Sequence, residues 1–119
     1  MAELVRAQRI SVFLPANDAR ERLAAFGVLD HMRELFSGYT MSTIDNPVFT
    51  GYWFNPDTGA VETDRIVIVF TDTQFASDDE PALRSAVDEL RQAMFDSYRA
   101  AGSPQVDVWV TVEAVRTTS

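Results

Sequence analysis

The sequence predicts an α+β fold of the ferredoxin-like class, with elements in the order βαββαβ. Hydrophobic residues recur at every second position in some segments and at helical spacing in two others, so strands and helices alternate along the chain. Turn-forming residues at 55–59 separate two of the strand segments and predict a central β-hairpin. We therefore expect a four-stranded antiparallel sheet in the order 4-1-3-2, with two helices on one face.

The composition excludes several kinds of chemistry. The 119 residues are enough for one domain, residues 1–119. There is no Cys, there is one His, and all ten basic residues are Arg, which excludes disulfides, thiolate metal sites and Schiff-base lysines. The net charge of −8 argues against nucleic-acid binding. No segment approaches the ~18 apolar residues of a membrane span, so we expect a cytoplasmic protein without a membrane partner.

The first strand and the first helix follow from local pattern. Residues 9–14 alternate and stop at Pro15, as expected of a strand. Residues 18–36 predict a helix in which Asp18 caps the N-terminus and Glu21 completes a capping box. Gly38 is placed to end this helix.

The central strands form the predicted hairpin. Two strand pieces, 39–43 and 49–54, lie on either side of turn-forming residues at 45–47. The next strand, 61–73, is apolar at every position from 66 to 70, which is typical of a strand covered on both faces.

The second helix and the last strand complete the pattern. Ser77 or one of the two following Asp residues is expected to cap the helix, with Pro81 in its first turn and Gly102 at its end. The strand at 106–115 alternates, which predicts that one of its faces is covered, and the polar tail 116–119 is expected to fray.

The expected core lies between the helices and the sheet. Its predicted members are Ile10, Val12, Leu14, Leu29, Met32, Phe36, Ile66, Ile68, Phe70, Leu83, Val87, Leu90, Met94, Val108 and Val110.

The other sheet face is predicted to expose apolar side chains. Phe13, Val67, Val69 and Trp109 are assigned to it by their positions in the alternating pattern. Monomers seldom expose large apolar patches, so these residues are interpreted as the interface of a homo-oligomer, a dimer or a trimer. A ligand pocket is the alternative.

Part of the sequence resembles a family. The residues are the run Leu35-Phe-Ser-Gly-Tyr-Thr40, then Gly51-Tyr-Trp53, Gly59 and Asp64. This stretch resembles small bacterial ferredoxin-like proteins, some of which are similar to PII-like signalling proteins. The chain departs from their pattern in having Ser37 where a Gly is common. The resemblance implies a small oligomer that binds a metabolite or nucleotide between subunits, and it implies no catalytic residue.

The turn at 36–40 could bind an anionic ligand, because its hydroxyls and backbone N–H groups are hydrogen-bond donors. A simple helix C-cap is the alternative interpretation. Arg65 could also receive an anion, and a surface ion pair explains it equally well. The candidate ligand-binding residues are Ser37, Gly38, Tyr39, Thr40, Trp53 and Arg65.

No metal, cofactor or catalytic group is predicted. Carboxylates in or beside the hairpin could bind Mg²⁺ or Ca²⁺, but turn formation and solvation explain them more simply. His31 could be a general base, but no nucleophile accompanies it. The carboxylates are Asp45, Asp57, Glu62 and Asp64.

Three hypotheses of function remain. The first is a non-enzymatic oligomeric binding or regulatory module of PII-like type. The second is a small cofactor-free enzyme of the dimeric α+β barrel type, a monooxygenase or an isomerase, with Tyr52, Trp53, Trp109 and His31 around a cavity between two sheets. A purely structural interaction protein is a third.

Overall fold

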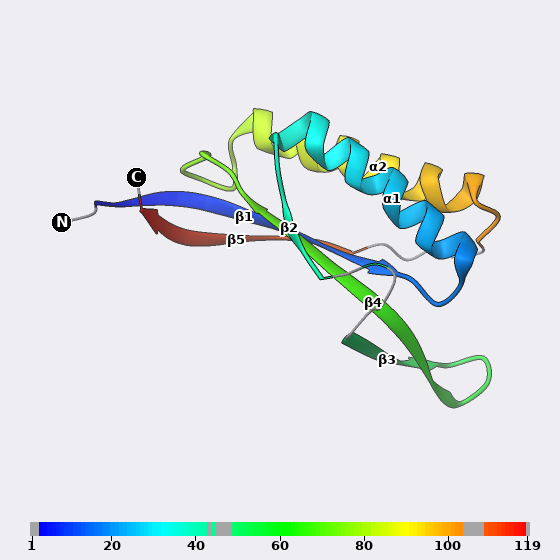
Figure 1. Cartoon of the computed structure of the whole chain (residues 1–119). Helices are drawn as coiled ribbons and strands as arrows, with labels where there is room; N and C mark the ends of the chain where they lie inside the picture. Colours follow the sequence, from blue (N-terminus) through cyan, green and yellow to red (C-terminus); the bar gives the residue numbers. More distant parts are fainter. Residues whose placement is uncertain (1–2, 43, 45–48, 104–108, 119) are drawn as a thin grey trace.

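Two helices lie on one face of a five-stranded antiparallel sheet in the computed structural model of the chain (Figure 1). The structure describes residues 3–42, 44, 49–103 and 109–118. The elements are, in order, β1 (Leu4–Pro15), α1 (Ala19–Phe36), β2 (Thr40–Met41), β3 (Phe49–Asn55), β4 (Ala60–Asp72), α2 (Pro81–Ala100) and β5 (Trp109–Thr118).

The sheet is built around β1 and β4. β5 pairs with the outer side of β1, which confirms the predicted place of the last strand beside the first. β2 and β3 both pair with the outer side of β4, β2 near its end and β3 along its beginning. The expectation of four strands is therefore wrong in number, because the two predicted pieces of the second strand form two separate strands, β2 and β3.

The two faces of β4 are the reverse of the prediction. Register partners in an antiparallel pair share a face, and Val67 and Val69 lie opposite Leu14 and Val12. All four side chains are fully buried under the helices. Val67 and Val69 are therefore core residues and do not lie on the open face.

The residues that were expected in the core instead of these valines are on the other face. Ile66, Ile68 and Phe70 alternate with the valines and are only partly buried. A run that is apolar on both faces does not itself say which face meets the helices, and the long-range register with β1 decides it.

The rest of the predicted core is confirmed for most residues. Val108 lies outside the described residues, and Phe36, Val87 and Val110 are partly buried and pack against the core. The fully confirmed members are Ile10, Val12, Leu14, Leu29, Met32, Leu83, Leu90 and Met94.

Helix α1 begins and ends as predicted, but a different residue provides its C-terminal stop. The Asp18 carboxylate accepts a hydrogen bond from the Glu21 backbone N–H at 2.9 Å. At the other end it is Ser37, not Gly38, that takes the left-handed conformation, with φ of 71°.

Helix α2 and β5 differ from the prediction at their ends. Glu80 is the N-cap of α2, and neither Ser77 nor an Asp caps it, because the Ser77 hydroxyl binds the Asp79 carboxylate. Residues 116–118 pair with β1 as part of β5 and are not a frayed tail. The first part of the predicted last strand, 106–108, lies outside the described residues.

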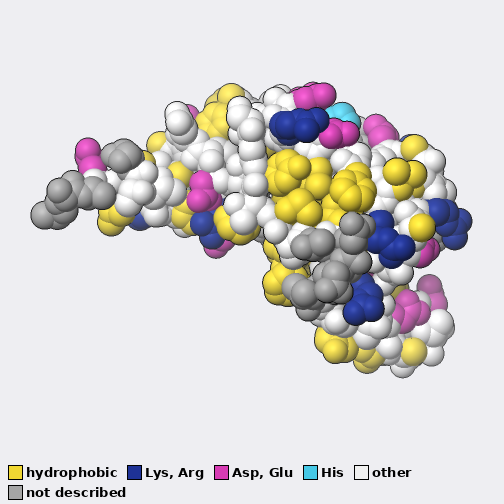
Figure 2. Space-filling view, in the orientation of Figure 1, with side chains coloured by type: hydrophobic (Ala, Val, Ile, Leu, Met, Phe, Trp, Pro, Cys, Tyr) yellow, Lys and Arg dark blue, Asp and Glu magenta, His cyan; other side chains and the backbone are white. Residues whose placement is uncertain are grey.

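The sheet extends beyond the helices in two directions (Figure 1). On one side the β3–β4 hairpin projects, and hydrophobic side chains lie on its surface (Figure 2). Tyr52, Phe54 and Val61 are all exposed there. On the other side the start of β1 and the end of β5 form a two-stranded ribbon. The principal extents of the molecule are 51 × 27 × 26 Å.

Candidate functional site

The face of the sheet that the helices leave open carries a group of apolar side chains. Phe13 of β1 lies opposite Ile68 of β4 on one side and Trp109 of β5 on the other. The Phe13 and Trp109 rings meet edge to face, with centroids 6.3 Å apart and planes at 76°. Ile66 and Phe70 flank Ile68 on the same face. These five residues are the open-face patch.

The open-face patch continues along the projecting hairpin. Phe49 lies opposite Ile66. Trp53 lies opposite Glu62, which precedes Ile66 by four residues on β4 and is therefore on the same face of the sheet. Phe49 and Trp53 thus share the face of the open-face patch. Both aromatic side chains are exposed, and Trp109 at the other end is 63% exposed. The apolar surface therefore crosses the sheet from β5 to β3.

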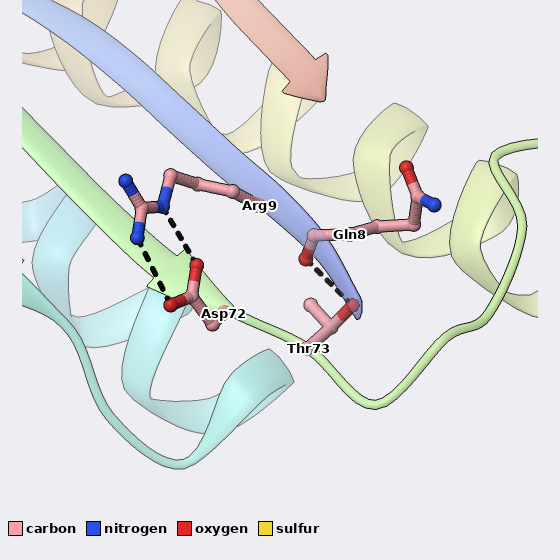
Figure 3. A network of polar contacts seen from close by, with 4 residues as sticks. All are labelled: Gln8, Arg9, Asp72 and Thr73. Carbon is pink, nitrogen blue, oxygen red and sulfur yellow. Dashed lines mark hydrogen bonds and ion pairs between the residues drawn. The ribbon is translucent and has the colours of Figure 1, made fainter. Parts of the chain in front are cut away.

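A fixed ion pair borders the open-face patch (Figure 3). Arg9 donates two hydrogen bonds to the Asp72 carboxylate, at 2.7 Å from Nε and 3.1 Å from Nη2. The Arg9 guanidinium also lies 4.4 Å from the centroid of the Phe70 ring. The hydrogen bonds from Arg9 lower the pKa of Asp72, and the same pair raises the pKa of Arg9. Because Asp72 neutralises it, Arg9 is not a free anion receptor.

The strand next to this pair is held by a second contact. The backbone carbonyl of Gln8 accepts hydrogen bonds from the Thr73 hydroxyl and the Thr73 N–H, both at 2.9 Å (Figure 3). These bonds fix the end of β4 against β1 and hold the border of the patch in place.

The predicted ligand-binding residues do not meet within one chain. Thr40 pairs with Phe70, whereas Trp53 pairs with Glu62, eight residues away along β4. At about 3.3 Å per residue this separates them by about 26 Å. Ser37, Gly38 and Tyr39 lead into β2 at the Thr40 end and are exposed.

Arg65 lies between these two groups, and its backbone belongs to a polar junction that the sequence did not reveal. The Asn17 side chain accepts a hydrogen bond from the Arg65 N–H at 2.8 Å. It also donates to Glu21 at 2.8 Å and to Asp64 at 2.9 Å. Asn17 thus joins the start of α1 to the root of the hairpin.

A buried tyrosine supports the same junction. The Tyr98 hydroxyl of α2 donates a 2.6 Å hydrogen bond to the Pro15 carbonyl, just before Asn17. Burial raises the pKa of Tyr98 far above the usual value, and the nearby Glu21 and Asp64 carboxylates add to the effect.

The described carboxylates that were considered as metal ligands form hydrogen bonds within the chain or lie apart from one another. Glu62 accepts a hydrogen bond from Asn55 at 3.1 Å, and Asp64 binds Asn17. Within the described part of the chain, no group of three His, Asp or Glu side chains is arranged to hold a metal ion. Asp45 lies outside that part, and the Asp57 N–H donates to the Asn55 side chain in the hairpin turn.

His31 is far from the aromatic residues with which the enzymatic hypothesis groups it. It lines an open groove between α1 and α2, together with Glu89 and Asp96. The open-face patch lies on the other side of the sheet, so one chain does not bring His31 and Trp109 to a common cavity.

The order of elements and the sheet topology define an α+β fold with two helices on one face of an antiparallel sheet, and this fold is similar to that of PII-like proteins. No family model and no curated protein matches the sequence. Solved structures do match. The apo form of CPII from Thiomonas intermedia K12, a nitrogen regulatory PII-like protein, has a TM-score of 0.54 at 15% identity, over 100% of this chain and 99% of that chain.

Two further structures have the same fold. A protein from Thermus thermophilus described as a PII-like signaling protein gives a TM-score of 0.53 at 14% identity, over 97% of this chain and 91% of that chain. A phage SAM lyase in complex with S-methyl-5′-thioadenosine gives 0.55 at 12%, over 95% and 90%. The resemblance to PII-like proteins is therefore confirmed at the level of the fold. Within the described residues no helix is both long and apolar enough to cross a membrane.

Proposed function

We propose that this chain is a non-enzymatic, homo-oligomeric binding module of PII-like type, which takes a small metabolite or anion between its subunits. The observation that carries the proposal is the open-face patch. It lies on neighbouring strands of the sheet, on the face away from the helices, where its side chains are exposed or only partly buried.

Burial of this face favours assembly. Trp109 alone is 63% exposed, and burying apolar surface contributes about 25 cal/mol per Å². The patch and its continuation through Phe49 and Trp53 supply several such side chains on one face. Closed symmetric assembly is the usual way in which a face of this kind is covered, so we expect a dimer or a trimer.

The spacing of the candidate ligand residues also favours a site between chains. The partners of Thr40 and Trp53 on β4 are eight residues apart, which separates the two residues by about 26 Å along the strand. A small ligand could touch both groups only if one came from a neighbouring subunit. CPII has been solved bound to ADP, AMP and bicarbonate, and we take these compounds as the first ligands to test.

Sedimentation equilibrium at micromolar concentration tests the assembly. The wild type should sediment as a dimer or trimer, and Trp109→Glu should shift it toward monomer, since a charge would enter a dry contact. Leu23→Glu is the matched control, because Leu23 is 67% exposed on α1 and away from the patch. A monomeric wild type, or equal effects of both substitutions, would overturn the proposal.

Calorimetric titration tests the ligand. ADP, AMP and bicarbonate are titrated separately into wild type and into Trp109→Glu. Saturable binding that is lost with the oligomer supports a site between subunits, and equal binding to the monomeric variant contradicts it.

A second candidate function is a small cofactor-free enzyme. The observation that favours it is that the phage SAM lyase has a similar fold. Its test is incubation of the wild type with S-adenosylmethionine, followed by chromatography. Formation of S-methyl-5′-thioadenosine would select the enzyme over the regulatory module.

A further inference from the structure

Two arginines lie side by side on the ribbon formed by the start of β1 and the end of β5. Arg6 and Arg116 are direct register partners, so their side chains leave the same face of the ribbon. Side chains opposite each other in this way start only about 4.5–5.5 Å apart, and like charges in such a pair repel. The sequence shows no sign of this pairing, because the two residues stand at opposite ends of the chain.

The arginine pair lines a hollow of about 280 Å³. The other described residues that line it are Ala76, Ala114 and Val115, so among the described residues its charged lining consists of Arg6 and Arg116. The Gln8 side chain donates a 3.3 Å hydrogen bond to the Ala76 carbonyl, which holds the loop after β4 over the ribbon. The hollow is therefore made by three separate segments of the chain.

Two acidic groups on the neighbouring strands do not face the arginine pair. Asp72 forms an ion pair with Arg9, and Glu113 lies opposite Arg9 on the other face of the ribbon. Among the described residues, neither Arg6 nor Arg116 forms an ion pair. In a chain with a net charge of −8, an adjacent pair of arginines without a carboxylate partner is a local reversal of charge.

We propose that Arg6 and Arg116 bind a phosphate-sized oxyanion in this hollow. A guanidinium presents paired N–H donors that fit two oxygens of one oxyanion, and two guanidiniums can share a single group. The volume is just below the range of ordinary small-molecule pockets, which suits a phosphoryl group better than a whole nucleotide.

This site is independent of the proposed assembly. All five lining residues belong to one chain, and the hollow lies on the ribbon rather than on the open-face patch. A monomer should therefore bind the anion as well as an oligomer does. Failure of either proposal leaves the other standing.

The test is a titration with inorganic phosphate at constant ionic strength, set with chloride. The side-chain Nε–H signals of Arg6 and Arg116 are followed by NMR in wild type, Arg6→Gln, Arg116→Gln and the double variant. Arg84→Gln, an exposed arginine of α2, is the control with the same change of charge. Trp109→Glu tests whether a monomer binds phosphate as the wild type does, and AMP is titrated in parallel.

Saturable shifts of both Nε–H signals are expected, and each single substitution should weaken phosphate binding about tenfold or more. Arg84→Gln and Trp109→Glu should bind as the wild type does. Tighter binding of AMP than of phosphate would show that the anion arrives as part of a nucleotide. Shifts that do not saturate, or that Arg84→Gln reduces equally, would overturn the proposal. The substituted residues are exposed, and circular dichroism confirms that each variant is folded.

Discussion

Gly27 of α1 faces Ser97 of α2 so closely that a Cβ at position 27 would lie 2.5 Å from the Ser97 Oγ. That hydroxyl is already in use, since it donates a 2.7 Å hydrogen bond to the Ala24 carbonyl across the same interface. The two helices therefore meet at a point where one has no side chain and the other has a small polar one.

Gly27→Ala should lower the free energy of unfolding by about 1–3 kcal/mol, because the new methyl group displaces the Ser97 hydroxyl. In Gly27→Ala/Ser97→Ala the clash is gone, since the Ser97 Cβ would be 3.6 Å away. The double variant should be more stable than Gly27→Ala alone, as urea unfolding will measure. Gly38→Ala, where no atom lies within 4 Å, is the control, and a loss of equal size there would contradict the explanation.

Tyr98→Phe should cost about 1 kcal/mol at pH 7, because the buried Pro15 carbonyl loses its hydrogen-bond donor. The pKa of Tyr98 is raised in the folded state, so its stabilising effect is complete below the unfolded pKa of about 10 and is lost as the pH rises above it. Urea unfolding between pH 8 and 11 should show a steeper loss of stability in the wild type than in Tyr98→Phe. Parallel curves would show that Tyr98 does not contribute to the alkaline transition.

Asp72→Asn should lower stability at pH 7 by about 0.2–1 kcal/mol, the range of partly exposed ion pairs. The pKa of Asp72 is lowered by Arg9, so the contribution exists above the unfolded pKa of about 3.9 and disappears as the pH falls through the folded pKa. Wild type and variant should therefore converge in acid. Asp30→Asn, which breaks a more exposed pair with Arg33, should have a smaller effect.

Asn17→Ala should free the root of the hairpin from the helix layer. It removes one side-chain acceptor and two side-chain donor contacts, and about 1–3 kcal/mol of stability is expected to be lost. The specific readout is hydrogen exchange at the Arg65 amide, which should accelerate. Asn55→Ala, at the hairpin turn, should leave that amide protected, and acceleration in both variants would mean that the hairpin loosens as a whole.

The sequence predicted the order of elements because local signals mark most of the turns between them. Asp18 caps α1 as expected, and the turn after Asn55 closes the hairpin. Local signals failed where two neighbouring residues could do the same task. Ser37 ends α1 in place of Gly38, although glycine is the usual residue in a left-handed conformation.

Features that depend on long-range register could not be predicted. The faces of β4 were reversed because Val67 and Ile68 are equally apolar, and only pairing with Leu14 and Phe13 distinguishes them. The same limit applies to the candidate site. Phe13 and Trp109 were assigned to the open face from the alternating pattern, whereas the pairing of Arg6 with Arg116 needs the register of β1 with β5.

The two extensions of the sheet also affect how the molecule moves through solution. Its radius of gyration is 15.4 Å, whereas a compact chain of 119 residues is expected to have one of about 13.5 Å. The hairpin and the ribbon project in different directions and add frictional drag with little mass. A single chain of this shape elutes from a gel-filtration column ahead of a spherical protein of the same 13.3 kDa mass, in the direction of a small dimer.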